Sequence, residues 1–279
     1  MFDLHMHTKF SDGIYNPDEL VERLKNEGVT LFSITDHNHS LAYEKYDNFD
    51  LNYIKGTEIA TSYEGVIIEI LGYKVDHKVI NEWYRDFYSA DNLAKIENLL
   101  FNDLKEMSKE NGYQVDQNLE MEKIEKGLSK KTIYYHLFEK YDDFEFKTYK
   151  ELFRRGLSNP ESPWFLDEGR TYPSIKEVID LIHKAGGIAF LAHPYEYGFD
   201  SFDKLFETLT DLGIDGIECF HPSCAMINSV KLAKYCVENK LLGSGGSDFH
   251  SDKRLVPLGV HINKNLFEFE CFDWIRELL

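Results

Sequence analysis

The sequence predicts an α/β fold in which a parallel sheet is interrupted by a helical insertion. Strand-like and helix-like segments alternate over residues 1–76 and again over residues 166–279, whereas residues 77–165 have a helical period with charged loops. Such alternation implies a parallel sheet, here with enough strands to close into a barrel. The length of 279 residues lies in the range in which α/β barrels fold as one domain.

The first helix is delimited by its flanking residues. The segment NPDELVERLKNEG places Asn16 at the N-cap, Pro17 at the first helical position and Gly28 just after the end. Four strands are predicted around and after this helix, at residues 2–7, 29–38, 53–60 and 66–73.

The strand VIIEILGY, residues 66–73, has the carboxylate of Glu69 at its centre. An ionised group in apolar surroundings is costly unless it is paired or bound to a metal. Glu69 is therefore expected either to face a metal or to point to solvent from a bend or a sheet edge.

The remaining elements follow the same alternation after the insertion. Within the insertion, residues 93–112 and 130–141 are helical in period. Beyond it, the pattern predicts helices at residues 173–187, 201–213 and 227–240, strands at 187–194, 213–223, 241–251 and 258–262, and a short closing helix.

The composition bears on the partners and the compartment. The net charge of −18, from 31 basic and 49 acidic residues, disfavours binding to duplex nucleic acid, which normally requires a basic face. A small phosphorylated substrate could still bind if divalent cations reversed the local field. The absence of a long apolar run, of an export signal and of CxxC pairs among four cysteines predicts a cytoplasmic protein without a membrane span. The oligomeric state is left open.

Histidine and acidic residues fall where several predicted strands end. They are His5 and His7, Asp36 and His37, Glu58, His193, and Asp248 and His250. In a parallel barrel these strand ends form one rim, and residues two apart share a strand face. Imidazole and carboxylate are ligands of divalent transition metals, so the pattern predicts a metal centre.

Each of these short motifs is weak by itself, and their repetition at separate strand ends carries the prediction. Five other histidines lack that placement and are expected to have ordinary surface or core roles: His39, His77, His136, His183 and His261.

The motifs HMHTKFSDG, ITDHN, GTEI, ILGY, LAHP and GSDFH, in this order, resemble those of the PHP (polymerase and histidinol phosphatase) family of metal-dependent phosphoesterases. The resemblance extends from residue 2 to about residue 262. It implies a distorted (β/α)7 barrel, residues 1–76 and 166–279, with two or three divalent ions (Mn, Fe or Zn) at its C-terminal rim. It also implies that the insertion, residues 77–165, covers that rim.

The resemblance further implies which residues would hold the metals. The first metal would be held by His5, His7, Glu58 and Asp248, the second by Glu58, Glu69 and His193, and the third by Asp12, His37 and His250. At the position of Glu69 the family usually has a histidine.

Contacts to the substrate are expected from loops and from the insertion. His221, which follows a strand, is a candidate phosphate donor or general acid, or else an ordinary loop histidine, and Ser223 lies beside it. The basic candidates are Lys131, Arg154, Arg155 and Arg170, most of which are expected to be solvated surface charges.

The leading hypothesis is hydrolysis of a phosphate monoester of a small metabolite, most similar to family members acting on nucleoside monophosphates or 3′,5′-bisphosphates. The alternatives are a histidinol-phosphate phosphatase, a PHP-type exonuclease and a non-catalytic metal-binding module.

Overall fold

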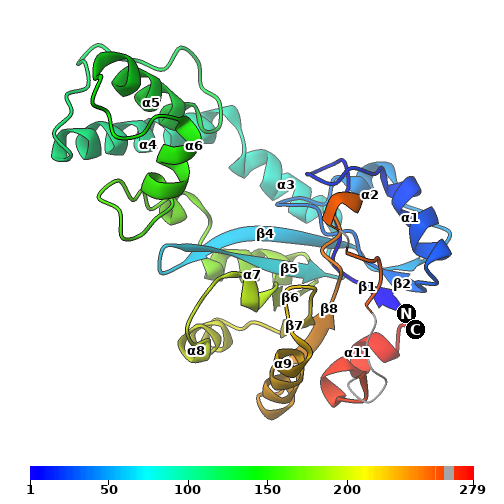
Figure 1. Ribbon diagram of the computed structural model, residues 1–279. Coiled ribbons are helices and arrows are strands. Elements are labelled where there is room, and N and C mark those ends of the chain that lie inside the picture. The colour runs from blue at the N-terminus through cyan, green and yellow to red at the C-terminus, as the bar shows by residue number, and fades with distance from the viewer. Residues whose placement is uncertain (255, 261–266) are drawn as a thin grey trace. The chain divides into compact units, whose positions relative to one another are not determined.

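The structure is a computed structural model that describes residues 1–254, 256–260 and 267–279. The chain divides into two compact units (Figure 1). The first comprises Met1–Tyr84 and Tyr172–Leu279, and the second comprises Arg85–Thr171. No helix in the described ranges is long and apolar enough to cross a membrane.

The first unit contains two β-sheets. One is parallel and consists of β1 (Phe2–Asp3), β2 (Leu31–Phe32) and β3 (Asn52–Tyr53). The other has five strands in the order β4 (Gly56–Tyr63), β5 (Val66–Tyr73), β6 (Ile188–Leu191), β7 (Gly216–Phe220) and β8 (Leu242–Gly245). Isolated bridges link the sheets: Met6, after β1, pairs with Phe249, after β8, and His37, after β2, pairs with Glu58 within β4.

The prediction of a wholly parallel sheet is wrong at two strand pairs. β5 runs antiparallel to both β4 and β6, and only β6, β7 and β8 are parallel in the larger sheet. The cause is the turn at Glu64 and Gly65, whose positive φ angles of 48° and 82° suit a tight hairpin. A two-residue turn forces the flanking strands to be antiparallel. The fold is therefore mixed α/β, with two sheets rather than one closed barrel among the described strands.

The bounds of β1, β2 and β4 also differ from the prediction. β1 and β2 are each two residues long, so His5, His7 and His37 lie beyond them in segments without regular strand pairing. Glu58 is the third of eight residues in β4 and does not end its strand. The predicted strand at residues 258–262 falls partly outside the described residues.

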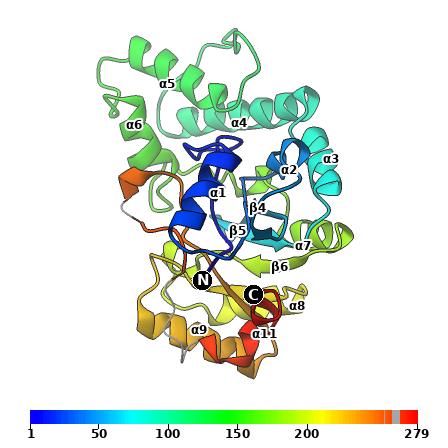
Figure 2. The ribbon, with the colours of Figure 1, turned by 90° about the vertical axis from the view of Figure 1, so that its right-hand side faces the viewer.

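The helices of the first unit are α1 (Pro17–Asn26), α2 (Ala42–Lys45), α3 (His77–Phe87), α7 (Ile175–Lys184), α8 (Asp203–Asp211), α9 (Met226–Glu238) and α11 (Asp273–Arg276), with α3 crossing the boundary between the units. The prediction for α1 is confirmed, because Pro17 is its first residue and Asn16 donates its backbone N–H to Glu19 Oε2 at 2.8 Å. α7 packs on β4, β5 and β6, and α9 packs on β7 and β8, so helices line the larger sheet (Figure 2).

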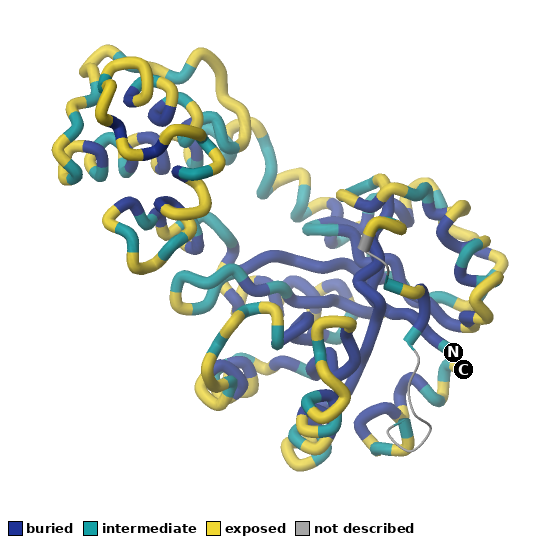
Figure 3. The backbone as a smooth tube through the Cα atoms, viewed as in Figure 1, coloured by how far each residue is buried: buried dark blue, intermediate teal, exposed yellow. Residues whose placement is uncertain are grey.

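The core of the first unit lies between this sheet and its helices. Figure 3 shows the strands buried along most of their length. Tyr73, Phe190 and Trp274 pack together with ring centroids 5.1–5.8 Å apart, and Trp274 Nε1 donates to the Gly243 carbonyl at 2.8 Å.

The second unit is helical and has its own core. It contains α4 (Ala90–Glu110), α5 (Leu128–Lys140) and α6 (Tyr149–Glu151), which continues as a π-helical turn over Leu152–Leu157. Tyr134 and Trp164 are buried in this core. Glu97 of α4 accepts backbone N–H groups of Gly127 and Ser129, which caps the start of α5.

Gly246, the residue after β8, packs closely against the backbone of His5. A Cβ on Gly246 would lie 2.4 Å from the backbone nitrogen of His5 and 2.2 Å from its Cβ. We expect Gly246→Ala to lower the free energy of unfolding by about 1–3 kcal/mol, because backbone atoms must shift to relieve the overlap. The measurement is thermal or denaturant unfolding of the full chain.

The matched control is Gly28→Ala. Gly28 has φ +77° but no atom within 4 Å of the added Cβ, so its cost is backbone strain alone, about 1–2 kcal/mol. We expect only Gly246→Ala also to weaken divalent-metal binding. Equal metal affinity in both variants would contradict the expectation that a side chain at Gly246 displaces His5.

Candidate metal centre

The nine predicted metal ligands lie close together in the first unit. They come from the segments after β1, β2, β6 and β8 and from the strands β4 and β5. Contacts of 3.0–3.6 Å between imidazole nitrogens and carboxylate oxygens connect His5, His7, Asp12, His37, Glu58, Glu69, His193, Asp248 and His250.

The carboxylate of Glu58 stands at the centre of this group. Its Oε1 lies 3.2 Å from His5 Nε2 and 3.0 Å from His193 Nε2. Its Oε2 lies 3.2 Å from His7 Nε2 and 3.1 Å from His37 Nδ1. Glu58 is fully buried, and each of its oxygens faces a different pair of rings. This arrangement suits a carboxylate that bridges two cations.

Glu69 points into the same centre, which answers the question raised by its place in a strand. In the β4–β5 hairpin, Ala60 stands opposite Glu69, so Glu58 and Glu69 are diagonal neighbours on one face. Glu69 Oε1 lies 3.3 Å from His37 Nδ1, and its Oε2 lies 3.3 Å from His193 Nε2. Its side chain is 22% exposed.

A second subset gathers around Asp12. Asp12 Oδ1 lies 3.2 Å from His250 Nε2, 3.6 Å from His37 Nε2 and 3.8 Å from His7 Nδ1. The loop that carries Asp12 is held by Asp36, which accepts hydrogen bonds from the backbone N–H and hydroxyl of Thr8 and from the hydroxyl of Ser11.

Two buried acids that position the ligands were not singled out from the sequence. Glu218 in β7 has Oε1 3.0 Å from His5 Nδ1, and its Oε2 accepts the backbone N–H of His193 at 2.8 Å. Asp3 accepts the backbone N–H groups of Ser247 and Gly259, and burial raises its pKa to about 6. The available signal for Glu218 was an acid inside the apolar strand GIECF, the same signal that marked Glu69.

The donor geometry fits divalent metals. His5 Nδ1 faces Glu218, and His250 Nδ1 donates to the Asp248 carbonyl at 2.8 Å, which leaves the Nε2 lone pair of each ring directed into the centre. Metal-bound histidines usually donate their other ring N–H in this way. His5 Nε2 and His7 Nε2 also approach to 3.3 Å, and both face Asp248 Oδ1. Two ring nitrogens converging with carboxylate oxygens are the ligands expected around a shared cation.

Without a bound metal, two imidazoles of this group, those of His37 and His193, hold protons. Burial lowers the pKa of His37, but the carboxylates of Glu58 and Glu69 outweigh burial and raise it to about 11. The same balance raises the pKa of His193 to about 10. Burial raises the pKa of Asp12, but His250 and its neighbours lower it to about 2. Protons and metal ions therefore compete for one set of donors.

The residues predicted to contact the substrate fall into two groups, one beside the candidate metal centre and one in the second unit. His221 Nε2 lies 3.5 Å from Asp248 Oδ2, and its Nδ1 lies 2.6 Å from Ser223 Oγ, so both residues adjoin the centre. The basic candidates Lys131, Arg154, Arg155 and Arg170 belong to the second unit, where all four are exposed. Arg155 pairs with Glu151 and Arg170 with Asp103. Their role in binding, and the covering of the rim by the insertion, stay predictions.

The other histidines have partners elsewhere. His39 Nε2 contacts the Phe10 carbonyl, His77 contacts Lys55, His136 accepts the Asp116 N–H, and His183 contacts Asp215. His261 lies outside the described residues.

Comparison with known proteins shows the family of the chain. A model described as the PHP domain matches residues 3–210. The chain is 28% identical to a phosphoribosyl 1,2-cyclic phosphate 1,2-diphosphodiesterase of Eggerthella lenta, over 91% of this chain and 96% of that protein. It is 27% identical to a 5′-3′ exoribonuclease of Haemophilus influenzae over 94% of both chains. It is 25% identical to a 3′,5′-nucleoside bisphosphate phosphatase of Chromobacterium violaceum over 89% of this chain and 87% of that protein.

A solved structure shares the fold. It is described as an amidohydrolase from Chromobacterium violaceum with bound sulfate and no metal. It superposes with a TM-score of 0.65 at 22% identity, covering 99% of this chain and 95% of that one.

Metal binding should release protons. Because His37 and His193 have raised pKa values of about 11 and 10, both rings are protonated at neutral pH and must become neutral to coordinate a metal. We expect Mn²⁺ affinity of the metal-free protein to rise between pH 6 and pH 8.5, by up to about tenfold per pH unit for each proton released. Calorimetric titration in buffers of different ionisation enthalpy measures the protons directly. An affinity that does not change with pH would contradict this assignment.

The role of Glu69 can be tested through metal content. We expect Glu69→Ala to bind fewer divalent ions per chain than the wild type, because His193 and Glu58 alone would hold the second ion weakly. The matched control is Glu64→Ala in the turn of the same hairpin, where Glu64 pairs with Lys204 at the surface. Elemental analysis after exchange into metal-free buffer gives the content. If Glu69→Ala and Glu64→Ala retain the same number of ions, Glu69 is not a ligand.

Proposed function

The chain belongs to the PHP domain family of metal-dependent phosphoesterases, and from this premise we propose that it hydrolyses a phosphate monoester of a small metabolite, a nucleoside monophosphate or 3′,5′-bisphosphate. The observation that carries the proposal is the buried Glu58 carboxylate, which two pairs of imidazoles contact at 3.0–3.2 Å.

The proposed ligands would hold two or three divalent ions in the sets given by the family motifs. Bound divalent ions supply hydroxide at neutral pH and neutralise charge on the phosphoryl oxygens. Three such ions would bring about six positive charges against four carboxylate ligands, so the centre would attract a phosphate in a chain of net charge −18. Glu218 would keep His5 in the required tautomer.

His221 is proposed to donate a hydrogen bond to the phosphate or to the leaving oxygen. Its Nδ1 accepts the backbone N–H of Ser223 at 3.1 Å, so the neutral ring carries its proton on Nε2. Nε2 faces Asp248 Oδ2, a proposed metal ligand. The tautomer therefore directs a donor toward the place where the reacting phosphate would sit.

We propose further that the two sheets are arcs of one distorted barrel. Contacts between the two sheets support this. The chain after β1 pairs with the chain after β8, and the chain after β2 pairs with β4. In addition, the Leu4 backbone N–H donates to the Gly245 carbonyl at 3.2 Å.

A second candidate is exonucleolytic cleavage of RNA. The observation in its favour is the 27% identity to a 5′-3′ exoribonuclease over 94% of both chains. Against it stands the acidic composition, since proteins that bind single strands usually offer a basic groove along the backbone.

The experiment is a substrate panel with metal-reconstituted protein. Chelated protein is reloaded with Mn²⁺, Fe²⁺ or Zn²⁺ and offered a nucleoside monophosphate, a 3′,5′-bisphosphate, histidinol phosphate and a 5′-phosphorylated oligoribonucleotide. We expect phosphate release from the small nucleotides, fastest with Mn²⁺ or Fe²⁺ because the carboxylate of Glu69 makes its site harder than an imidazole would. Chelation should abolish the activity.

Other outcomes decide between the candidates. Faster release of mononucleotides from the oligoribonucleotide than of phosphate from the small nucleotides would favour the exonuclease. No turnover of any substrate, with two or three ions bound, would favour a non-catalytic module.

A further inference from the structure

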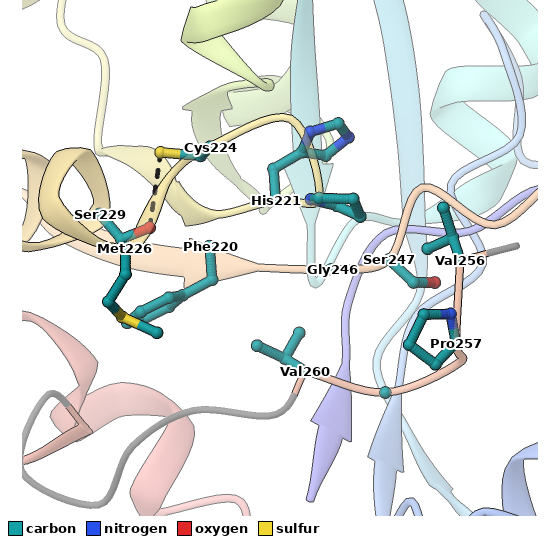
Figure 4. A pocket seen from close by; sticks show the side chains of 12 residues that line it. Phe220, His221, Cys224, Met226, Ser229, Gly246, Ser247, Val256, Pro257 and Val260 are labelled. Carbon is teal, nitrogen blue, oxygen red and sulfur yellow. Dashed lines mark hydrogen bonds between the residues drawn. The ribbon is translucent and has the colours of Figure 1, made fainter. Parts of the chain in front are cut away.

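An apolar pocket of about 220 Å³ adjoins the candidate metal centre within the first unit (Figure 4). One side is formed by Phe220 at the end of β7 and by Met226 at the start of α9. The other is formed by Val256, Pro257 and Val260. Lysine, arginine, aspartate and glutamate are absent from its described lining.

A second, polar pocket of about 290 Å³ lies on the other side of His221. It is lined by Glu196, Ser223 and Asp248, and it shares His221, Pro222, Ser247 and Val256 with the apolar pocket. The two pockets thus meet at His221. The polar pocket is lined by Asp248, which contacts His5 and His7 of the centre, and the apolar pocket is lined mainly by hydrophobic side chains.

This division matches the two halves of a nucleotide. A phosphate held at the metal centre would place its ester oxygen near His221, and the organic half would then have the apolar pocket beside it. An enclosed apolar cavity of about 150 Å³ accommodates one benzene ring, so a pocket of about 220 Å³ has room for a larger heteroaromatic ring. The Phe220 ring and the polarisable Met226 thioether are suitable surfaces for a flat π-system.

We propose that this pocket binds the nucleobase of the substrate and that Met226 is a specificity-determining residue. The proposal rests on the function proposed above and adds where the organic half is recognised. Ser229 provides the polar contact: its hydroxyl donates to Cys224 Sγ at 3.4 Å and keeps lone pairs that can accept a hydrogen bond from a ring N–H.

The pocket's mouth offers a site for a test that leaves the metal centre intact. Met226 is 52% exposed, so a larger side chain there can enter the pocket without disturbing the core. The matched control is Ile227, the next residue of α9, which is 63% exposed and does not line the pocket.

The test compares AMP with ribose 5-phosphate, which has the same phosphate and sugar but no base. For Mn²⁺-loaded wild type we expect kcat/KM to favour AMP at least about tenfold, the change expected for about 1.4 kcal/mol of ring binding. Met226→Trp should reduce this ratio at least about tenfold by filling the pocket, whereas Ile227→Trp should leave it within about twofold.

Adenosine supplies a readout that does not depend on turnover. Its binding to the Mn²⁺-loaded protein, measured by calorimetry, should be weakened about tenfold by Met226→Trp and not by Ile227→Trp. If Met226→Trp leaves the ratio of kcat/KM for AMP to kcat/KM for ribose 5-phosphate unchanged, the pocket does not bind the base. The proposed phosphatase activity would not be affected by that result.

The two proposals can fail separately. The protein could hydrolyse no phosphate ester and still bind adenosine with an affinity that Met226→Trp lowers. That result would reject the proposed reaction and support the assignment of the pocket. A preference for histidinol phosphate over AMP that is lost in Met226→Trp would show that the pocket binds an imidazole ring, and would reject the nucleobase.

Discussion

The structure of the first unit depends on the compensation of one buried negative charge. Glu58 is fully buried and would be costly to ionise alone, but four imidazoles contact its two oxygens. These rings come from segments after β1 and β2 in one sheet and after β6 in the other. The same carboxylate therefore fixes how the histidine segments of the two sheets meet. In the metal-free state the rings supply positive charge as imidazolium, and a bound metal would supply it as a cation.

The hairpin of β4 and β5 gives this centre a second acid. Because the strands pair antiparallel with Ala60 opposite Glu69, the side chains of Glu58 and Glu69 fall on one face. The carboxylate of Glu69 lies between His37 and His193. It adds a negative charge, which favours hard divalent cations and raises the proton affinity of both rings. If Glu69 is a ligand, one acidic side chain in a strand would thus affect both the metal preference and the pH dependence of binding.

Much of this site follows from the sequence, and the misses have physical reasons. Seven of the nine candidate ligands were predicted because each belongs to a short motif at a predicted strand end, whereas Asp12 and Glu69 were included through the family resemblance. Glu218 was missed although it is an acid inside an apolar strand, because it contacts His5 and His193 rather than belonging to a ligand motif, and such a role leaves no spacing pattern. The antiparallel hairpin was missed although Glu64 and Gly65 form a turn sequence, because alternation elsewhere suggested a uniform parallel sheet. The apolar pocket could not be predicted, since Phe220 and Val260 meet only through the tertiary fold.

The charge distribution explains how an acidic chain could select a small phosphorylated substrate. The overall charge of −18 repels polyanions at long range, where many phosphates add up, while ions at the centre would act over a few ångströms. A substrate with one or two phosphates gains the short-range attraction and suffers little of the long-range repulsion. The organic half must then contribute binding of its own, and the side chains next to His221 that can provide it are apolar. Discrimination among phosphate esters would thus depend on the group beyond the ester oxygen, because the candidate metal centre would contact the part that all of them share.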